Sequence, residues 1–273
     1  DTMVTVVDAV NLLRDCSSHD FLKDRGETLG EDDERTLVHL LVEQIEFANV
    51  VVLNKVADAT AHKVEASRQI IRSLNADAKI IETSHSDIPA TAILNTGLFD
   101  FDKAHENPMW AKELYGFADH VPETEEYGVA SFVYRARRPF EPEKVMAVLN
   151  GDLVGVIRAK GHFWIATRPD WVAEFSLAGA LSSIKPLGTW WASVPKDRWP
   201  EHDSIPGYIT EHWQEPWGDR RQEIVFIGAG IDWANIKEQL DAALVSEDIA
   251  KSPDTLPNFP DPLPLWRRAE QAA

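Results

Sequence analysis

The sequence is poor in cysteine and in long hydrophobic runs. Cys16 is the single cysteine in 273 residues, so an intramolecular disulfide is excluded, and no neighbouring thiol is present to share a metal ion. We therefore expect an ordinary thiol. No apolar run approaches the roughly 18 to 20 residues that span a bilayer, and the first residues lack a basic segment followed by an apolar one. These absences predict a cytoplasmic protein without a membrane partner.

Positive charge is also scarce. The chain has 27 Lys and Arg against 45 Asp and Glu, which gives a net charge of -18. Proteins that bind a nucleic-acid backbone need clustered cations to replace its counterions, so we expect no nucleic-acid partner. With 44% hydrophobic residues, the chain is still able to bury one or two ordinary cores.

A third absence concerns phosphate binding. Gly-Lys-Ser or Gly-Lys-Thr, the end of a phosphate-binding loop, occurs nowhere in the sequence. The sequence also offers no residue that we identify as catalytic and no cluster that we identify as a metal site.

The first hundred residues alternate between short β-branched runs and amphipathic helical patterns. This alternation predicts an α/β fold with a parallel sheet and right-handed crossovers. Ligands of such sheets lie at the carboxyl ends of the strands. Strands are expected at residues 3–7, 50–53 and 79–82, and helices at 31–47 and 60–74.

Polar residues follow each of these strands. Asn54 and Lys55 end the second one, and an Asn-Lys-x-Asp loop after a hydrophobic strand holds guanine in many GTP-binding folds. The spacing of this motif places the carboxylate that recognises guanine at position 57. This sequence has Ala57 there, and Asp58 follows one residue later. Either the loop is longer and Asp58 takes the role, or guanine preference is relaxed. Asp8, after the first strand, is placed to reach a water or metal shell near phosphates or to cap a helix.

Residues 101–128 are rich in Asp, Glu, His, Asn and Pro and are expected to be a linker. Strands then predominate over helices, which predicts a smaller α+β domain at residues 129–250. A Pro-rich tail is expected at 251–273. Within the second domain we expect strands at 129–134, 155–158, 162–166, 173–175, 185–191 and 223–227, and helices at 141–149 and 232–244.

Two patterns in the second domain have alternative interpretations. Gly228-Ala-Gly230 follows a strand as a dinucleotide fingerprint does, but Trp233 occupies the third glycine position. We interpret it as a turn, with Asp232 capping the next helix. His202 and His212 share an acidic, Trp-rich loop, which is either a metal site or a solvated loop.

Several segments, in this order and at this spacing, resemble the CobW-like GTPase and zinc metallochaperone family. The resemblance covers nearly the whole chain, as the second half of a P-loop-type GTPase domain followed by the CobW C-terminal domain. The segments are 5–9, 30–36, 43–55 and 95–99, and then 127–140, 158–164 and 217–223.

The resemblance implies a nucleotide-hydrolysing metal chaperone, and the pattern looks most like the zinc-linked branch, with a cobalt or nitrile-hydratase-activating relative as the alternative. The family's P-loop and Cys-x-Cys-Cys metal site precede the first strand of this chain. We therefore expect the C-terminal portion of a longer protein that binds GTP with Mg²⁺, carries Zn²⁺ and presents its C-terminal domain to a client metalloprotein.

The resemblance also implies roles for individual residues. Asn54 orients the base-binding loop, the stem of Lys55 covers one face of the base, and Asp58 reads guanine. Ser84 and His85, in a loop like the family's Thr-His-Gly-Asp-Ile, complete the base pocket. The competing hypothesis is an interaction or regulatory module that binds no nucleotide.

Overall fold

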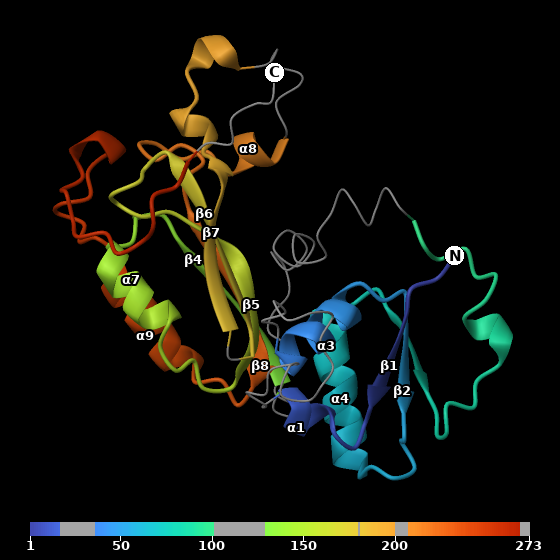
Figure 1. Cartoon of the computed structure of the whole chain (residues 1–273). Coiled ribbons are helices and arrows are strands. Elements are labelled where there is room, and N and C mark those ends of the chain that lie inside the picture. The colour runs from blue at the N-terminus through green and yellow to red at the C-terminus, as the bar shows by residue number, and fades with distance from the viewer. Residues whose placement is uncertain (17–35, 101–128, 180, 200–206, 268–273) are drawn as a thin grey trace.

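Two sheets with helices between and beside them make up the structure (Figure 1). The expected linker lies outside the described residues, as does the start of the first expected helix. The structure is a computed structural model, and it describes residues 1–16, 36–100, 129–179, 181–199 and 207–267.

The first sheet is three-stranded and parallel, with the order β1-β2-β3. Its central strand is buried on both faces, which explains the uninterrupted run of apolar residues. The parallel α/β arrangement expected from the sequence is confirmed. The elements are β1 (Val4–Asp8), α1 (Leu12–Cys16), α3 (Leu37–Glu46), β2 (Val50–Asn54), α4 (Ala61–Leu74), β3 (Lys79–Glu82) and a short turn of 3-10 helix, η1 (Ala90–Ala92).

Threonine side chains fix where the two longer helices of this unit begin. The Thr36 hydroxyl accepts a hydrogen bond from the backbone N–H of His39 at 3.2 Å, and Thr60 accepts one from Lys63 at 3.3 Å. Each hydroxyl satisfies an N–H that has no partner within its helix. Because Thr60 caps α4 only a few residues after β2, the intervening loop is short and its course is fixed at both ends.

The second sheet is five-stranded and antiparallel, with the order β4-β8-β5-β6-β7. Helices α7 and α9 cover one of its faces (Figure 1). The expected α+β architecture is therefore confirmed. The elements are β4 (Val129–Ala136), α7 (Pro142–Leu149), β5 (Val156–Phe163), β6 (Trp171–Ala178), β7 (Leu181–Thr189), η3 (Trp191–Ser193), η4 (Lys196–Arg198), α8 (Gly207–Glu211), β8 (Gln222–Ala229), α9 (Trp233–Ala243) and η6 (Pro253–Thr255).

The strand boundaries expected in this sheet are partly wrong. One strand, β5, runs from Val156 to Phe163, so it joins the expected run 155–158 to the start of the expected run 162–166 and continues through Gly161. A Cβ at Gly161 would lie 2.1 Å from the carbonyl oxygen of Glu223, so this glycine allows β8 to approach closely and does not mark a turn. The strand expected at 185–191 begins earlier and ends before the tryptophan pair, as β7.

The two units share one hydrophobic core. Helices α1, α3 and α4 lie between the two sheets (Figure 1), and residues of β5 and β8 are buried against them. The carboxylate of Glu46, at the end of α3, receives a hydrogen bond of 2.7 Å from Nε of Arg158 on β5. Only 6% of the Arg158 side chain is exposed. The face of the second sheet away from α7 and α9 is thus partly covered by the first unit.

The described part of the tail packs against the second unit. Arg168 donates to a carboxylate oxygen of Asp261 at 2.8 Å, and its guanidinium lies 4.4 Å from the ring centroid of Trp266. Trp266 in turn contacts the ring of Trp171. No helix among the described residues has the length and apolar character needed to cross a membrane.

Candidate functional site

Two loops at the carboxyl end of the parallel sheet are joined by side-chain hydrogen bonds. The Asn54 side-chain amide donates to the hydroxyl of Ser86 at 2.9 Å and accepts from the Ser86 backbone N–H at 3.0 Å. A second bond runs from the backbone N–H of Ala57 to the Ser84 hydroxyl, at 3.0 Å. The loop after β2 and the loop after β3 therefore form one rigid rim.

The backbone of this rim is unusual. Lys55, His85 and Ser86 have φ angles of 62°, 59° and 55°. Residues other than glycine rarely adopt this left-handed conformation, and the surrounding contacts must hold it. The paired bonds between Asn54 and Ser86 supply that restraint on both loops. Residues in strained backbone conformations are concentrated at ligand sites, so the rim is the first candidate for a functional site.

Asp8 fixes the position of the Lys55 ammonium group. Nζ of Lys55 donates to a carboxylate oxygen of Asp8 at 2.7 Å, and Asp8 also accepts from the side-chain amide of Asn11 and the N–H of Val10, both at 2.8 Å. Since α1 begins only at Leu12, Asp8 is not its N-cap. Among the two roles expected for Asp8, capping is therefore excluded, and an ion pair with Lys55 is found.

These contacts shift both pKa values. Burial raises the pKa of Asp8, but the hydrogen bonds from Lys55, Asn11 and Val10 outweigh it and hold this pKa below its ordinary value. The hydrogen bond and charge of Asp8 raise the pKa of Lys55, and the charge of Asp58 adds to the effect. Lys55 is therefore a cation whose charged end is anchored to Asp8.

Asp58 lies in the same turn as Lys55. Its backbone N–H donates to the carbonyl oxygen of Lys55 at 3.0 Å, and its side chain is exposed. His85 is exposed as well, whereas Ser84 is half-buried beneath the Ala57 N–H. The structure thus brings together all five residues expected at a base pocket, namely Asn54, Lys55, Asp58, Ser84 and His85.

The sequence analysis does not identify Ser86 as a member of the rim, and it does not predict the contact between Asp8 and Lys55. Ser86 provides both bonds to Asn54, although the sequence pattern points only to the loop that contains it. The pairing of Asp8 with Lys55 is also missed. A signal for it exists, because Asp8 and Asn54 end neighbouring parallel strands in register, which brings residues just after them to one edge.

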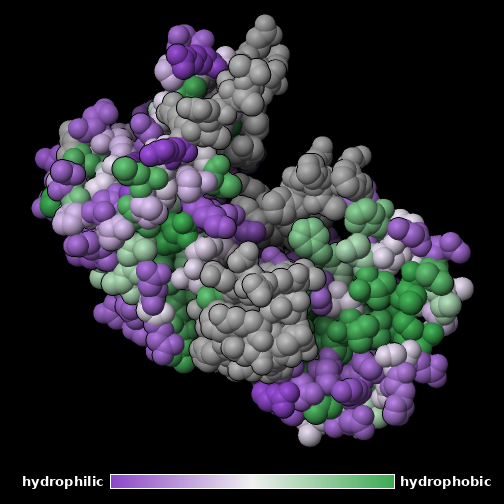
Figure 2. Space-filling view, viewed as in Figure 1, coloured by the Kyte–Doolittle hydropathy of each residue, from purple (hydrophilic) through white to green (hydrophobic). Residues whose placement is uncertain are grey.

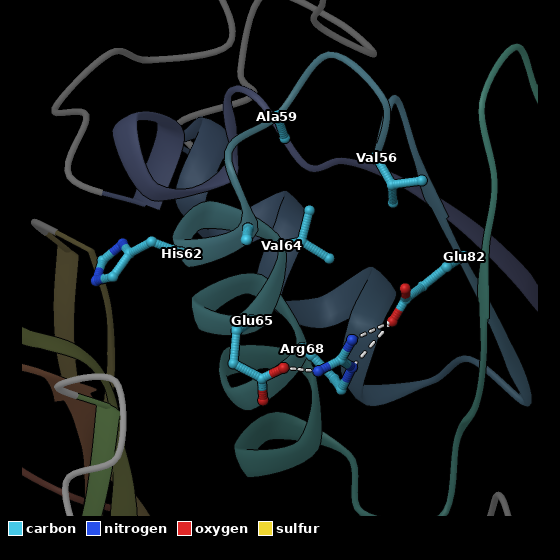
Figure 3. A pocket seen from close by; sticks show the side chains of 8 residues that line it. Val56, Ala59, His62, Val64, Glu65, Arg68 and Glu82 are labelled. Carbon is cyan, nitrogen blue, oxygen red and sulfur yellow. Dashed lines mark hydrogen bonds and ion pairs between the residues drawn. The ribbon is translucent and has the colours of Figure 1, made fainter.

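A cavity of about 620 Å³ adjoins the rim (Figure 3). Its apolar wall includes Val56, Ala59 and Val64, and Arg68 lies between the carboxylates of Glu65 and Glu82. The Arg68 Nε lies 2.9 Å from Glu82. This cavity lies against α4 and is lined by none of the five base-pocket residues, so it is a neighbour of the rim and not the predicted pocket itself.

The other sequence candidates have structural explanations or remain open. The Asp232 side chain accepts from the N–H of Asn235 at 3.1 Å, which confirms it as the cap of α9. Trp233 stacks on Phe132 with ring centroids 4.9 Å apart, as a core residue does. His202 lies outside the described residues. Across the part of the chain that is described, no three His, Cys, Asp or Glu side chains cluster closely enough to hold a metal ion.

A parallel sheet whose strand ends form a polar rim defines the class of α/β domains that bind ligands at that edge. Residues 1–82 match the family model for the CobW/HypB/UreG nucleotide-binding domain, and residues 129–244 match that for the cobalamin synthesis protein cobW C-terminal domain. The chain therefore belongs to the CobW family, and it contains parts of both domains in the order that the sequence indicated.

Curated relatives match most of this chain. The zinc-regulated GTPase metalloprotein activator 1 of Dictyostelium discoideum is 41% identical over 276 residues, which cover 99% of this chain and 58% of that protein. The zinc chaperone Rv0106 of Mycobacterium tuberculosis is 29% identical over 88% of this chain and 58% of its own length. The chain thus spans less than two thirds of either relative.

A solved structure is also similar. The Zn(II)-bound YjiA GTPase from E. coli is 18% identical, with a TM-score of 0.38 over 90% of this chain and 61% of that chain.

Proposed function

We propose that this chain is the C-terminal portion of a GTP-binding and GTP-hydrolysing metal chaperone that delivers zinc to a client metalloprotein in the cytoplasm. The rim formed by the loops after β2 and β3 would hold the guanine base. The observation that carries the proposal is the double hydrogen bond between Asn54 and Ser86, which joins two loops with left-handed residues into one rigid edge. Such preorganisation lowers the cost of ordering a ligand site on binding.

The residues of the rim fit a purine base. A carboxylate selects guanine by accepting two hydrogen bonds from the base edge, and Asp58 is exposed and lies in the same turn as Lys55. The Lys55 stem would cover one face of the base, with its charged end bound to Asp8. GTP would bring Mg²⁺ with its phosphates, and zinc would be the cargo.

The remainder of the nucleotide site would lie in a further segment of the protein. The chain has no Gly-Lys-Ser/Thr, and it spans 58% of the length of its curated relatives. Hydrophobic surface gathers over the first unit (Figure 2), and Val4 and Val6 of β1 are 38% and 57% exposed. Exposed apolar strand surface of this kind is typical of an interface, and we infer that the further segment packs there.

Asp58→Ala, made in the intact protein, tests the assignment of the base pocket. The variant loses two hydrogen bonds to a charged acceptor, so we expect the preference for GTP over ATP to fall roughly 100-fold. Isothermal titration with each nucleotide measures that ratio. Asp77→Ala, at the opposite end of the sheet, is the matched control and should leave it unchanged. An unchanged preference in Asp58→Ala contradicts the assignment.

The same titration separates the proposal from a module that binds no nucleotide. The intact protein should bind GTP, and this chain alone should bind it much more weakly because it lacks a phosphate loop. Failure of the intact protein to bind either GTP or ATP at millimolar concentration would contradict the chaperone function. Zinc transfer to a client is then measured with a chromogenic zinc indicator, with and without GTP.

A further inference from the structure

The end of the described chain lies along the second unit without joining its sheet. After α9, the chain continues over this unit as an irregular segment (Figure 1). Among the described residues, no backbone-to-backbone hydrogen bond connects residues 256–267 to the rest of the chain. The segment is therefore held in place by side chains, and it contributes no strand to the antiparallel sheet.

Arg168 supplies three of the hydrogen bonds that hold this segment. Its Nε donates to the carboxylate of Asp261 at 2.8 Å, and its Nη1 and Nη2 donate to the carbonyl oxygens of Pro264 and Leu263, both at 2.7 Å. The Thr167 hydroxyl donates to the same carboxylate oxygen of Asp261 at 2.6 Å. Because a guanidinium group presents its donors in a fixed plane, one carboxylate and two successive carbonyl groups are bound together.

The Asp261 carboxylate is bound in its charged form. Burial raises the pKa of Asp261, but the hydrogen bonds from Thr167, Arg168 and the Leu263 N–H outweigh it and hold this pKa below its ordinary value. The Arg168 side chain is only 13% exposed, so this ion pair is largely shielded from water. A carboxylate is therefore favoured at this position over a neutral side chain.

Trp266 packs between two side chains of the second unit. The Arg168 guanidinium lies 4.4 Å from its ring centroid, and the Trp171 ring meets it edge to face at 6.0 Å. We call Thr167, Arg168 and Trp171 the tail seat. The Nε1 atom of Trp266 is buried and has no hydrogen-bond partner among the described residues. An unpaired buried donor costs free energy, so the chain's own tail is not an ideal ligand of this seat.

Proline residues give the segment its shape before it binds. Pro260, Pro262 and Pro264 have a fixed φ, and the residue before a proline is restricted to extended conformations. Asp261 and Leu263, which lie between these prolines, contact the second unit, whereas the three prolines are exposed. Since the segment is extended in advance, little conformational entropy is lost when it binds.

We propose that the tail seat is a recognition site for an extended, proline-rich segment of a partner protein, and that the chain's own tail occupies the seat as an intramolecular competitor. The segment would carry Asp-Pro-x-Pro-x-aromatic, in which the first x is apolar. Its aspartate would bind Arg168 and Thr167, and its aromatic ring would lie against Trp171. Docking of proline-rich segments on aromatic side chains is a general mode of peptide recognition.

Two features make the tail displaceable. It has no backbone hydrogen bonds to the rest of the chain among the described residues, and it leaves the Trp266 N–H unpaired. A tail on the same chain competes at an effective concentration on the order of 1 mM. A segment and a tail with equal Kd values of about 10 µM would therefore give roughly 100-fold weaker binding of the segment to the native chain. A partner overcomes this difference by a better fit or by contacts elsewhere.

The proposal is independent of the proposed function. Binding at the tail seat is measured without nucleotide or zinc, and the seat lies on the second unit, away from the rim formed by the loops after β2 and β3. Failure of peptide binding therefore leaves the GTP site untouched, and failure of GTP binding leaves the peptide result intact.

The test uses the full chain with both tail anchors removed, Asp261→Ala combined with Trp266→Ala. A fluorescein-labelled peptide of residues 258–267, Asn-Phe-Pro-Asp-Pro-Leu-Pro-Leu-Trp-Arg, is titrated with this variant by fluorescence anisotropy. We expect saturable binding with a Kd below about 100 µM, and binding to the native chain that is at least about 10-fold weaker. A peptide with alanine in place of its aspartate should also bind at least about 10-fold more weakly.

Arg168→Lys, added to the tail variant, keeps the charge but loses the planar set of donors, and should weaken peptide binding about 10-fold. Arg14→Lys is the matched control, because Arg14 is 71% exposed on α1, and it should leave the Kd within about two-fold. Circular dichroism checks that each variant is folded. If the double variant is not, Asp261→Ala alone takes its place.

Three results would overturn the proposal. The first is the absence of saturable binding to a folded tail variant. The second is equal binding of the peptide to the native chain and the tail variant, or equal binding of a peptide of scrambled sequence. The third is a dimer of the native chain in sedimentation velocity that is lost in Arg168→Lys, because the seat would then take the tail of a second copy and not a segment of a partner protein.

Discussion

The two sheets differ in how completely their apolar surface is covered. In the antiparallel sheet, Phe163 and Phe226 are fully buried beneath α7 and α9. In the parallel sheet, β1 alternates between buried and exposed residues, and Val6 is 57% exposed although it is β-branched and apolar. Only a buried face contributes the full hydrophobic free energy. The second sheet thus carries a complete core of its own, whereas the first depends on contacts beyond its three strands.

The parallel and the antiparallel sheet also differ in which of their surfaces is polar. The parallel sheet presents its loops as a rigid rim, and its helices are held between the sheets by Arg158 and Glu46. In the antiparallel sheet, Arg135 of β4 is 46% exposed, whereas its partner Glu223 on β8 is buried. The nucleotide proposal concerns the strand ends of the parallel sheet.

The largest expected effect comes from breaking the complete core. Phe226→Ala removes a fully buried ring that packs against Trp233, and should lower the free energy of unfolding by about 3 to 5 kcal/mol. Val6→Ala, at the exposed face of β1, should lower it by less than about 0.5 kcal/mol. Urea unfolding of both variants measures the contrast. Similar losses would show that the two sheets are covered alike.

A second change tests the connection between the regions. Glu46→Ala leaves the buried guanidinium of Arg158 without its carboxylate, so the free energy of unfolding should fall by about 3 kcal/mol. Glu43→Ala is the control, since its carboxylate is 46% exposed and lies 3.0 Å from Nε2 of His39. In Glu43→Ala, the free energy of unfolding should fall by less than about 1 kcal/mol. If Glu46→Ala behaves like Glu43→Ala in urea unfolding, the ion pair does not hold the regions together.

A smaller effect, dependent on pH, arises at His162. Burial, together with the charge of Arg221, lowers the pKa of His162 from 6.5 to about 3 in the folded chain. Between those values the unfolded chain binds a proton that the folded chain does not. Stability is therefore fully present above pH 6.5 and falls by up to about 1.4 kcal/mol per pH unit below it.

His162→Gln should remove this part of the pH dependence, measured as the difference in urea midpoint between pH 7 and pH 5. His62→Gln, exposed on α4, is the control and should keep the slope of the parent chain. An undiminished slope in His162→Gln would contradict the assignment.

Local features of the chain can be predicted from the sequence alone. The β-branched runs correctly indicate β1, β2 and β3, and Asp232 caps α9 as its position suggests. Glu141 likewise marks the start of α7 within one residue of expectation. These features depend on neighbours within a few positions, so propensity and capping chemistry suffice to locate them.

Features that depend on distant partners are misjudged or missed by the same reasoning. The sequence predicts two strands, at 155–158 and 162–166, where the structure has β5, because the approach of Glu223 that requires glycine at position 161 comes from a segment 62 residues later. Ser86 is not distinguished from other loop residues, because its value lies in reaching Asn54 across 32 positions. Strand register decides both contacts.

The sequence by itself determined the acidic character of the chain, the alternation of β1, α3, β2, α4 and β3 in the first unit, and the polar residues at the strand ends. Those properties follow from composition and from local hydrogen bonding. Only the tertiary structure decided that Ser86 forms two hydrogen bonds with Asn54, that Arg158 reaches Glu46, and that polar residues from Arg135 to Lys185 align in one row across five strands. Each of these arrangements joins residues far apart in the chain, and their positions are fixed by how the sheets and helices pack, which no local pattern specifies.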